Sequence, residues 1–232
     1  MDAAIVHGGN YFLALMIAPS FAGYQHSALS DHTIETISRR VREHEPELFT
    51  PTRQTRQAAV AVVLHHACDQ TNVLFIKRAT VAGDPWSGHI AFPGGHMDDG
   101  DLDLIDAAIR ETEEEIGLDL RESHLIGPLS HQRAAPRGRT IDMLVAPYVF
   151  VVESMPSLTL NHEVDEVVWG SFNDMFKGHN HDVEFRAVAD AQIPFNGYRI
   201  EQQHFVWGLT YRTLQTLFTA VDPEYSEPVE PS

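Results

Sequence analysis

Residues 94–118 read GGHMDDGDLDLIDAAIRETEEEIGL, a glycine pair followed by a strongly acidic segment that carries the clearest structural signals of the chain. Within it, residues 104–116 carry apolar side chains at helical spacing, namely Ile105, Ile109 and Ile116. That spacing predicts an amphipathic α-helix with one face turned toward a core. Asp101 or Asp103 can cap the start of this helix, and Gly117 can end it by adopting a left-handed conformation.

The predicted helix carries three carboxylates on one side. Glu111, Glu114 and Glu115 stand at positions i, i+3 and i+4, so their side chains point to one patch. Like charges at this spacing repel each other, whereas a divalent cation between them would turn the repulsion into attraction. Carboxylate oxygens suit Mg²⁺ or Mn²⁺, and the neighbouring Arg110 can orient one of the carboxylates. The alternative interpretation is an ordinary solvated helix face.

A pair of glycines precedes this helix in the segment Phe92-Pro-Gly-Gly95. Gly94 and Gly95 lack a Cβ atom, so backbone groups at these positions can come close to a ligand. Taken alone, such a segment indicates only a turn. Beside an acidic helix, it indicates a binding loop.

Short apolar runs on both sides of this region predict β-strands. Residues 58–64 (AAVAVVL) are typical of a buried strand, and residues 73–78 (VLFIKR) of its hairpin partner. Residues 145–152 and 164–169 predict two further strands. Helices and strands alternate without a repeating βαβ rhythm, which predicts an α+β fold with a mixed sheet.

Helices are also predicted toward both ends of the chain. One begins at Ser30 or Asp31 and ends before Pro46, because the residue before a proline disfavours the α conformation. Another, amphipathic helix is expected over residues 205–218. From residue 222 the chain alternates proline with acids, which predicts a disordered tail.

The composition excludes several classes of function. The 232 residues include 16 Lys+Arg against 33 Asp+Glu, a formal net charge of −17. Binding to nucleic acid or to an anionic membrane surface needs clustered basic residues, so neither partner is expected. The single cysteine, Cys68, excludes an intramolecular disulfide and favours a reducing compartment. We therefore expect a cytoplasmic protein.

Residues 95–118 resemble the Nudix box, G-x5-E-x7-R-E-U-x-E-E-x-G-U, in which U is a bulky apolar residue. The second half, which begins at Arg110, matches at each fixed position except Thr112, where an aliphatic residue is usual. The first half departs from the pattern, because Asp101 replaces the Glu and eight residues separate it from Arg110. We therefore expect no essential role for the Asp101 carboxylate.

The resemblance extends over roughly residues 56–220 and is strongest to the branch that contains coenzyme A pyrophosphatases. That branch carries the upstream signature L-L-T-x-R-[SA]-x3-R-x3-G-x3-F-P-G-G. In this chain Gly83 stands where the second Arg is expected, and one extra residue precedes Gly88. The match is partial, which leaves specificity for coenzyme A open.

The resemblance implies a Nudix-type α/β/α sandwich with a mixed central sheet and an N-terminal helical extension. It implies three regions: an extension over 1–52, a Nudix hydrolase domain over 53–221 and an acidic tail over 222–232. The implied activity is divalent-metal-dependent hydrolysis of a diphosphate linkage, with coenzyme A or a thioester of it as the leading substrate. Another nucleoside diphosphate compound and a non-catalytic nucleotide-binding module remain as alternatives.

The resemblance also assigns roles to individual residues. The expected ligands of Mg²⁺ or Mn²⁺ are Glu111, Glu114, Glu115 and the backbone of Gly95. The expected catalytic residues are Arg110, which orients a carboxylate, and a general base drawn from Glu114, Glu163 and Glu166. The expected contacts to a small nucleotide substrate are Arg78, Gly94, Gly95, Arg137 and Arg139. Formation of a homodimer is one role open to the first 50 residues, and coverage of the substrate cleft is another.

Overall fold

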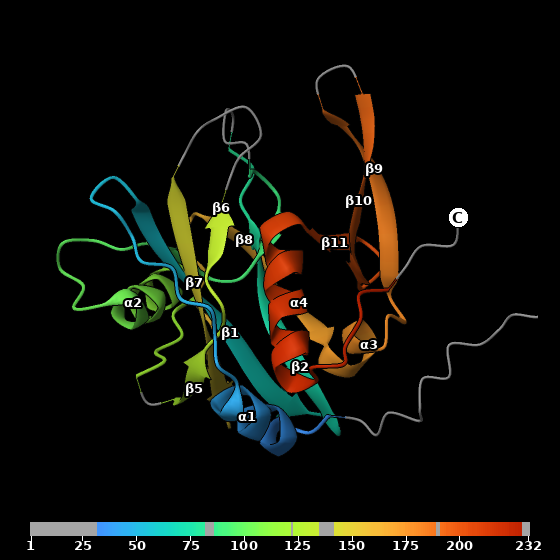
Figure 1. Ribbon diagram of the computed structural model, residues 1–232, viewed down its shortest axis with the longest axis horizontal. Helices are drawn as coiled ribbons and strands as arrows, with labels where there is room; N and C mark the ends of the chain where they lie inside the picture. Colours follow the sequence, from blue (N-terminus) through green and yellow to red (C-terminus); the bar gives the residue numbers. More distant parts are fainter. Residues whose placement is uncertain (1–31, 82–85, 122, 135–141, 189–190, 229–232) are drawn as a thin grey trace, which may run out of the picture. The chain divides into compact units, whose positions relative to one another are not determined.

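The central β-sheet is built on the apolar run that the sequence predicts as a buried strand. In the computed structural model, which describes residues 32–81, 86–121, 123–134, 142–188 and 191–228, that run is the middle of strand β1 (Arg56–Ala67). β1 pairs antiparallel with β2 (Gln70–Arg78) and parallel with β7 (Met143–Val152), so the sheet is mixed as expected (Figure 1). These elements belong to one compact unit of the chain, Asp31–Ser232.

Shorter strands extend this sheet on both sides. The strand order is β3-β2-β1-β7-β5, with β4 paired to β1, β6 to β7 and β8 to β2. The bounds of these strands are β3 Ile90–Ala91, β4 Gly94–His96, β5 His124–Pro128, β6 Gln132–Ala134 and β8 Val164–Ser171. The pairing of β4 with β1 places the glycine pair directly against the centre of the sheet.

Helices cover both faces of the sheet, because successive side chains of a strand point to opposite sides. Ala59, Ala61 and Val63 of β1 share one buried cluster with residues of α2 (Leu104–Ile116). Val62 and Leu64 point the other way and are also fully buried. That second face is covered by helices that contact β1, β2 and β6, namely α1 (Ile34–Glu43), α3 (Phe172–Phe176) and α4 (Gly208–Val221). Figure 1 shows α2 and α4 on opposite sides of β1, the expected α/β/α arrangement.

A second sheet, which the sequence did not predict, precedes α4. It has the order β11-β10-β9, with β9 at His181–Val188, β10 at Ala191–Ile200 and β11 at His204–Trp207. The prediction of one helix over 205–218 is therefore wrong at its start. Trp207 is extended and Gly208 has a φ of +64°, so the chain changes from strand to helix at this glycine.

Both ends of the described chain pack against the same unit. α1 lies within the predicted helix but begins later than predicted: its cap is Thr33, whose hydroxyl accepts a hydrogen bond of 3.3 Å from the Thr36 N–H, and not Ser30 or Asp31, which lie outside the described residues. The sequence predicts disorder from residue 222, yet the structure describes contacts up to residue 228: the Tyr225 ring packs on Phe218, and Glu227 accepts a hydrogen bond of 2.6 Å from the Tyr211 hydroxyl. The division of the chain at residue 52 stays a prediction. None of the described helices is long and apolar enough to cross a bilayer.

Candidate active site

Helix α2 begins and ends where the sequence predicts, and this fixes which side chains meet the glycine loop. The Asp103 carboxylate caps the helix by accepting hydrogen bonds from the backbone N–H groups of Ile105 and Asp106, at 2.8 and 2.9 Å. Gly117 ends the helix in the left-handed conformation, with a φ of 69°. With both ends fixed, Arg110, Glu111 and Glu115 lie in the middle of a well-defined helix.

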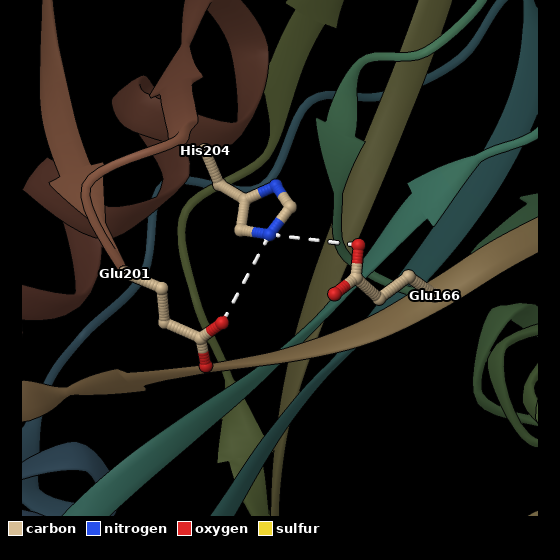
Figure 2. Close-up of side chains that lie close together, drawn as sticks. All are labelled: Glu166, Glu201 and His204. Carbon is tan, nitrogen blue, oxygen red and sulfur yellow. Dashed lines mark ion pairs between the residues drawn. The ribbon is translucent and has the colours of Figure 1, made fainter.

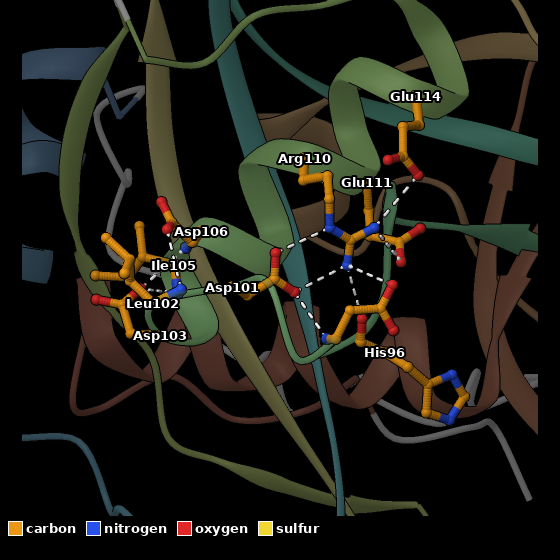
Figure 3. A network of polar contacts seen from close by, with 10 residues as sticks. His96, Asp101, Leu102, Asp103, Ile105, Asp106, Arg110, Glu111 and Glu114 are labelled. Atoms are coloured by element: carbon orange, nitrogen blue, oxygen red, sulfur yellow. Dashed lines mark hydrogen bonds and ion pairs between the residues drawn. The ribbon is translucent and has the colours of Figure 1, made fainter.

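Arg110 connects α2 to the loop before it (Figure 3). Its Nε and Nη2 each donate to a different oxygen of Asp101, both at 2.9 Å, and Nη2 also donates to the His96 carbonyl at 3.0 Å. Its Nη1 donates to Glu111 at 3.0 Å and to Glu114 at 3.3 Å. A planar guanidinium fixes the direction of every group bound to it, so Arg110 holds two carboxylates of α2, where the sequence predicts that it orients one.

The structure gives Asp101, for which the sequence predicts no essential role, a contact that the sequence did not predict. Its side chain is only 5% exposed and forms the two-pronged contact with Arg110. That contact holds the pKa of the Asp101 carboxyl below its usual range. Asp101 departs from the motif in residue type and in spacing, so the sequence did not predict this contact. In the folded loop its carboxylate still reaches Arg110, although its side chain is shorter than that of the usual Glu.

Replacing Asp101 with Asn should misplace Arg110, because the amide nitrogen would face a guanidinium that can only donate. We expect Asp101→Asn to lower turnover by about 10- to 100-fold and stability by about 1–3 kcal/mol. Steady-state kinetics and thermal unfolding check both effects. Asp99→Asn is the matched control, because Asp99 is exposed in the same loop. If the two variants behaved alike, Asp101 would not be a positioning residue.

Glu115 is a carboxylic acid buried at the base of the site. It is 2% exposed, and the backbone N–H of Gly94 donates to its Oε2 at 2.9 Å. Burial, with a smaller contribution from the nearby charge of Glu111, raises the pKa of Glu115 to about 7. Burial also raises the pKa of Glu111, against the opposing effect of Arg110. Two poorly solvated carboxylates therefore lie side by side.

The glycine pair allows these carboxylates to lie on the loop. At Gly94, where φ is +144°, a Cβ atom would stand 2.2 Å from the Ala59 carbonyl oxygen. At Gly95, a Cβ atom would stand 2.4 Å from the carboxyl carbon of Glu111. The Glu111 carboxylate thus occupies the space that any other residue at position 95 would fill. Two carboxylates with incomplete solvation, close to the backbone of the glycine pair, fit a hard divalent cation such as Mg²⁺ or Mn²⁺.

In the metal-free protein, the raised pKa of Glu115 predicts a stability that falls as the pH rises. Between its ordinary value of 4.5 and the folded value of about 7, the folded chain holds a proton that the unfolded chain has released. We expect the free energy of unfolding to drop by about 3 kcal/mol across this interval, at about 1.4 kcal/mol per pKa unit. Urea unfolding in EDTA at pH 5 and pH 8 measures the drop. Glu115→Gln should abolish most of it, and an equal drop in that variant would show another cause.

The other expected site residues differ in how they relate to Glu111 and Glu115. The Glu114 side chain is 57% exposed, and its Oε2 accepts from the same Arg110 Nη1 atom that binds Glu111, so it lies at the exposed side of the pair. The charges of Arg78 and Glu163 both influence the pKa of Glu115, which places these residues within electrostatic reach of it. Arg137 and Arg139 lie outside the described residues.

Glu166 is not brought together with the acids of α2. It pairs across the sheet with Lys77, and its carboxylate faces the ring of His204 at 3.5 Å (Figure 2). Its neighbours Val167 and Trp169, which point the other way from the strand, pack on the cluster that α2 covers. Of the two acids that the sequence offers outside the helix, Glu163 is therefore the one near Glu115.

A cavity of about 660 Å³, which was not predicted from the sequence, lies beside the loop that Arg110 holds. It runs between the start of β1 and the loop before α2, and its lining includes Arg56, His96 and Asp101. Arg56 was not among the expected site residues, because nothing in its local sequence separates it from a solvated strand end. The cavity offers a nucleotide-sized space next to the acidic helix.

Comparison with known proteins gives one family match and several relatives. The family model described as the NUDIX domain matches residues 55–211. An uncharacterized Nudix hydrolase NudL of Photorhabdus laumondii is 30% identical over 161 residues, which are 68% of this chain and 81% of that protein. The mitochondrial coenzyme A diphosphatase NUDT8 of Mus musculus is 27% identical over 187 residues, with 77% of this chain and 86% of that protein covered.

A further relative is longer than this chain. An uncharacterized protein of Schizosaccharomyces pombe is 34% identical over 146 residues, which make up 54% of this chain. The match spans 44% of the length of that protein.

Proposed function

The chain belongs to the Nudix family, and on that premise we propose that it hydrolyses the diphosphate linkage of coenzyme A or of a coenzyme A thioester. The products would be 3′,5′-ADP and a phosphopantetheine. The observation that carries the reaction class is the pair of the half-buried Glu111 and the buried Glu115 against the Gly94–Gly95 backbone. The substrate rests on the relation to the mouse coenzyme A diphosphatase and on the upstream segments shared with that branch.

The residues that would hold a divalent cation are Glu111, Glu115 and the backbone carbonyl of Gly95. Mg²⁺ or Mn²⁺ bound there would neutralise charge on the diphosphate and help a water molecule to lose its proton. Glu114, whose carboxylate shares Arg110 Nη1 with Glu111, would join this set by exchanging that hydrogen bond for the cation. The local positive charge also matters because a chain of net charge −17 would otherwise repel its substrate.

Hydrolysis needs a proton acceptor for the attacking water. The water oxygen would bond to one phosphorus while the bond from that phosphorus to the bridging oxygen breaks, and the proton would pass through a carboxylate to solvent or product. We infer that Glu114 or Glu163 takes this role: Glu114 adjoins Glu111 at Arg110, the charge of Glu163 reaches Glu115, and Glu166 faces His204 instead. Arg110 would act as a positioning residue that keeps Glu111 aimed at the loop.

Positively charged side chains at the edge of the site would bind the rest of the nucleotide. Arg78 lies within electrostatic reach of Glu115, and Arg56 lines the adjoining cavity. Contacts from Arg137 and Arg139 stay a prediction, as does a homodimer. A cytoplasmic location also stays a prediction, and the mouse relative is named as mitochondrial.

A substrate panel tests the proposal. Coenzyme A, ADP-ribose, a nucleotide sugar, NADH and a diadenosine polyphosphate are each incubated with the protein and Mg²⁺ or Mn²⁺, and kcat/KM is obtained from the separated products. We expect the highest value for coenzyme A. A higher value for another compound would keep the reaction class and reject the substrate.

Two alternatives would each leave a distinct result in this panel. Gly83 in place of the second signature Arg favours another nucleoside diphosphate compound, such as ADP-ribose. A nucleotide-binding module without catalysis would bind panel compounds and release no product from any of them.

A further inference from the structure

A buried histidine lies between two carboxylates at the junction of the two sheets, apart from the acids of α2. His204, at the start of β11, is 6% exposed. Its Nε2 atom faces the Oε2 atoms of Glu166 at 3.5 Å and of Glu201 at 4.0 Å (Figure 2). Glu166 belongs to β8 of the large sheet, whereas Glu201 belongs to the turn between β10 and β11 of the small sheet.

Hydrogen bonding does not account for this convergence. Good N–H···O bonds span about 2.7–3.2 Å, and both carboxylates stand beyond that range. A protonated ring has a single N–H at Nε2 and could serve only one of them. The side-chain nitrogen of Gln203 also lies 3.1 Å from the same ring nitrogen. Several groups thus face one nitrogen atom that can satisfy only one of them.

The spacing is instead that of ligands around a small cation. The three donor atoms all lie within 4.8 Å of one another, and across the described residues this is the only His/Cys/Asp/Glu group that meets that spacing. A tetrahedral site with bonds of about 2.0–2.2 Å to nitrogen and oxygen places its ligand atoms about 3.3–3.6 Å apart. The observed 3.5 and 4.0 Å need only small side-chain movements to reach this arrangement.

We propose that Glu166, Glu201 and His204 form a second divalent-cation site, suited to a transition metal with Zn²⁺ as its representative. One imidazole and two carboxylates form a ligand set that Zn²⁺ accepts, whereas Mg²⁺ prefers oxygen ligands alone. His204 also lines a cavity of about 320 Å³ together with Lys77 and Trp207, which gives a cation a route from solvent.

Such a site would join the two sheets. Within the described residues, β8 and the hairpin of β10 and β11 come from separate sheets. A cation held by one carboxylate from the large sheet and two ligands from the small sheet would fix their relative position. The small sheet also carries Arg186 and Trp207 into the lining of the same cavity, so the cation would keep these side chains in place.

Zinc binding in the presence of excess Mg²⁺ tests this proposal. The full-length protein carries the double substitution Glu111→Gln and Glu115→Gln, which removes the buried pair of α2 as a competing site. Protein exposed to Zn²⁺ is dialysed, and the retained metal is measured by mass spectrometry. We expect about one equivalent of Zn²⁺, together with a rise in Tm when Zn²⁺ is added.

Single substitutions in this background decide between this site and any other. Glu201→Gln should lose the retained Zn²⁺ and the rise in Tm; its side chain is 52% exposed, so the fold should persist. His204→Gln should do the same, and Glu224→Gln is the control on an exposed acid. The proposal is overturned if the parent protein retains no Zn²⁺, or if Glu201→Gln and Glu224→Gln retain it equally.

Discussion

Glu115→Gln is expected to lower turnover by about two to three orders of magnitude while the fold is retained. The loss corresponds to about 3–4 kcal/mol of transition-state stabilisation, the scale expected when a cation no longer neutralises the diphosphate. The amide has nearly the volume of the carboxyl group, and its oxygen can still accept the hydrogen bond from Gly94. Since the buried group is then neutral at every pH, the variant should be no less stable than the parent.

The control for this prediction lies on the same helix. Glu113 is exposed and pairs with Arg121, away from the glycine loop, so Glu113→Gln should retain near-normal turnover. Product formation and Mn²⁺ affinity are measured for both variants, with circular dichroism to confirm the fold. Near-normal turnover in Glu115→Gln would remove this residue from the set of metal ligands.

Gly95→Ala should have the next largest effect, because it adds a methyl group where the Glu111 carboxylate lies. The new Cβ atom would stand 2.4–2.6 Å from three atoms of that carboxylate, so the side chain of Glu111 must move. Displacement of a catalytic group by about 1 Å can cost about 100-fold in rate. We expect turnover to fall by about that factor. The fold should persist, because the clash is with the end of a flexible side chain.

Gly100→Ala is the matched control in the same loop, since a Cβ atom there meets nothing within 4 Å. It should leave turnover and Mn²⁺ affinity near the parent values. The informative measurement is Mn²⁺ affinity, which Gly95→Ala should weaken and Gly100→Ala should not. Equal affinities in the two variants would show that the contact between Gly95 and Glu111 does not shape the site.

The sequence predicted best where local signals were strong and agreed with one another. Helix α2 has a capping Asp103, a terminal Gly117 and a patterned interior, and its predicted bounds match the structure. Strand β1 is a continuous apolar run, as expected for a strand covered on both faces. The acidic helix and its glycine loop could therefore be placed from the residues alone.

Prediction failed where an outcome depended on tertiary contacts. Residues 205–207 (FVW) are apolar enough for a helix or a strand, and pairing with β10 decides for the strand. Asp101 looked dispensable because only the folded loop shows that it reaches Arg110. Glu163 directly precedes β8 and Glu166 lies in it three residues later, and nothing in the local sequence predicts that Glu166 meets His204 from another sheet.

The central claim, a cation-dependent diphosphate hydrolase, is tested most directly with coenzyme A as substrate. Protein stripped of metal is incubated with coenzyme A in EDTA and, in parallel, with excess Mg²⁺, and 3′,5′-ADP is measured by chromatography over time. The account predicts steady release of 3′,5′-ADP with Mg²⁺ and almost none in EDTA. Equal release under both conditions, or no cleavage of any nucleoside diphosphate compound while the cation is bound, would contradict it.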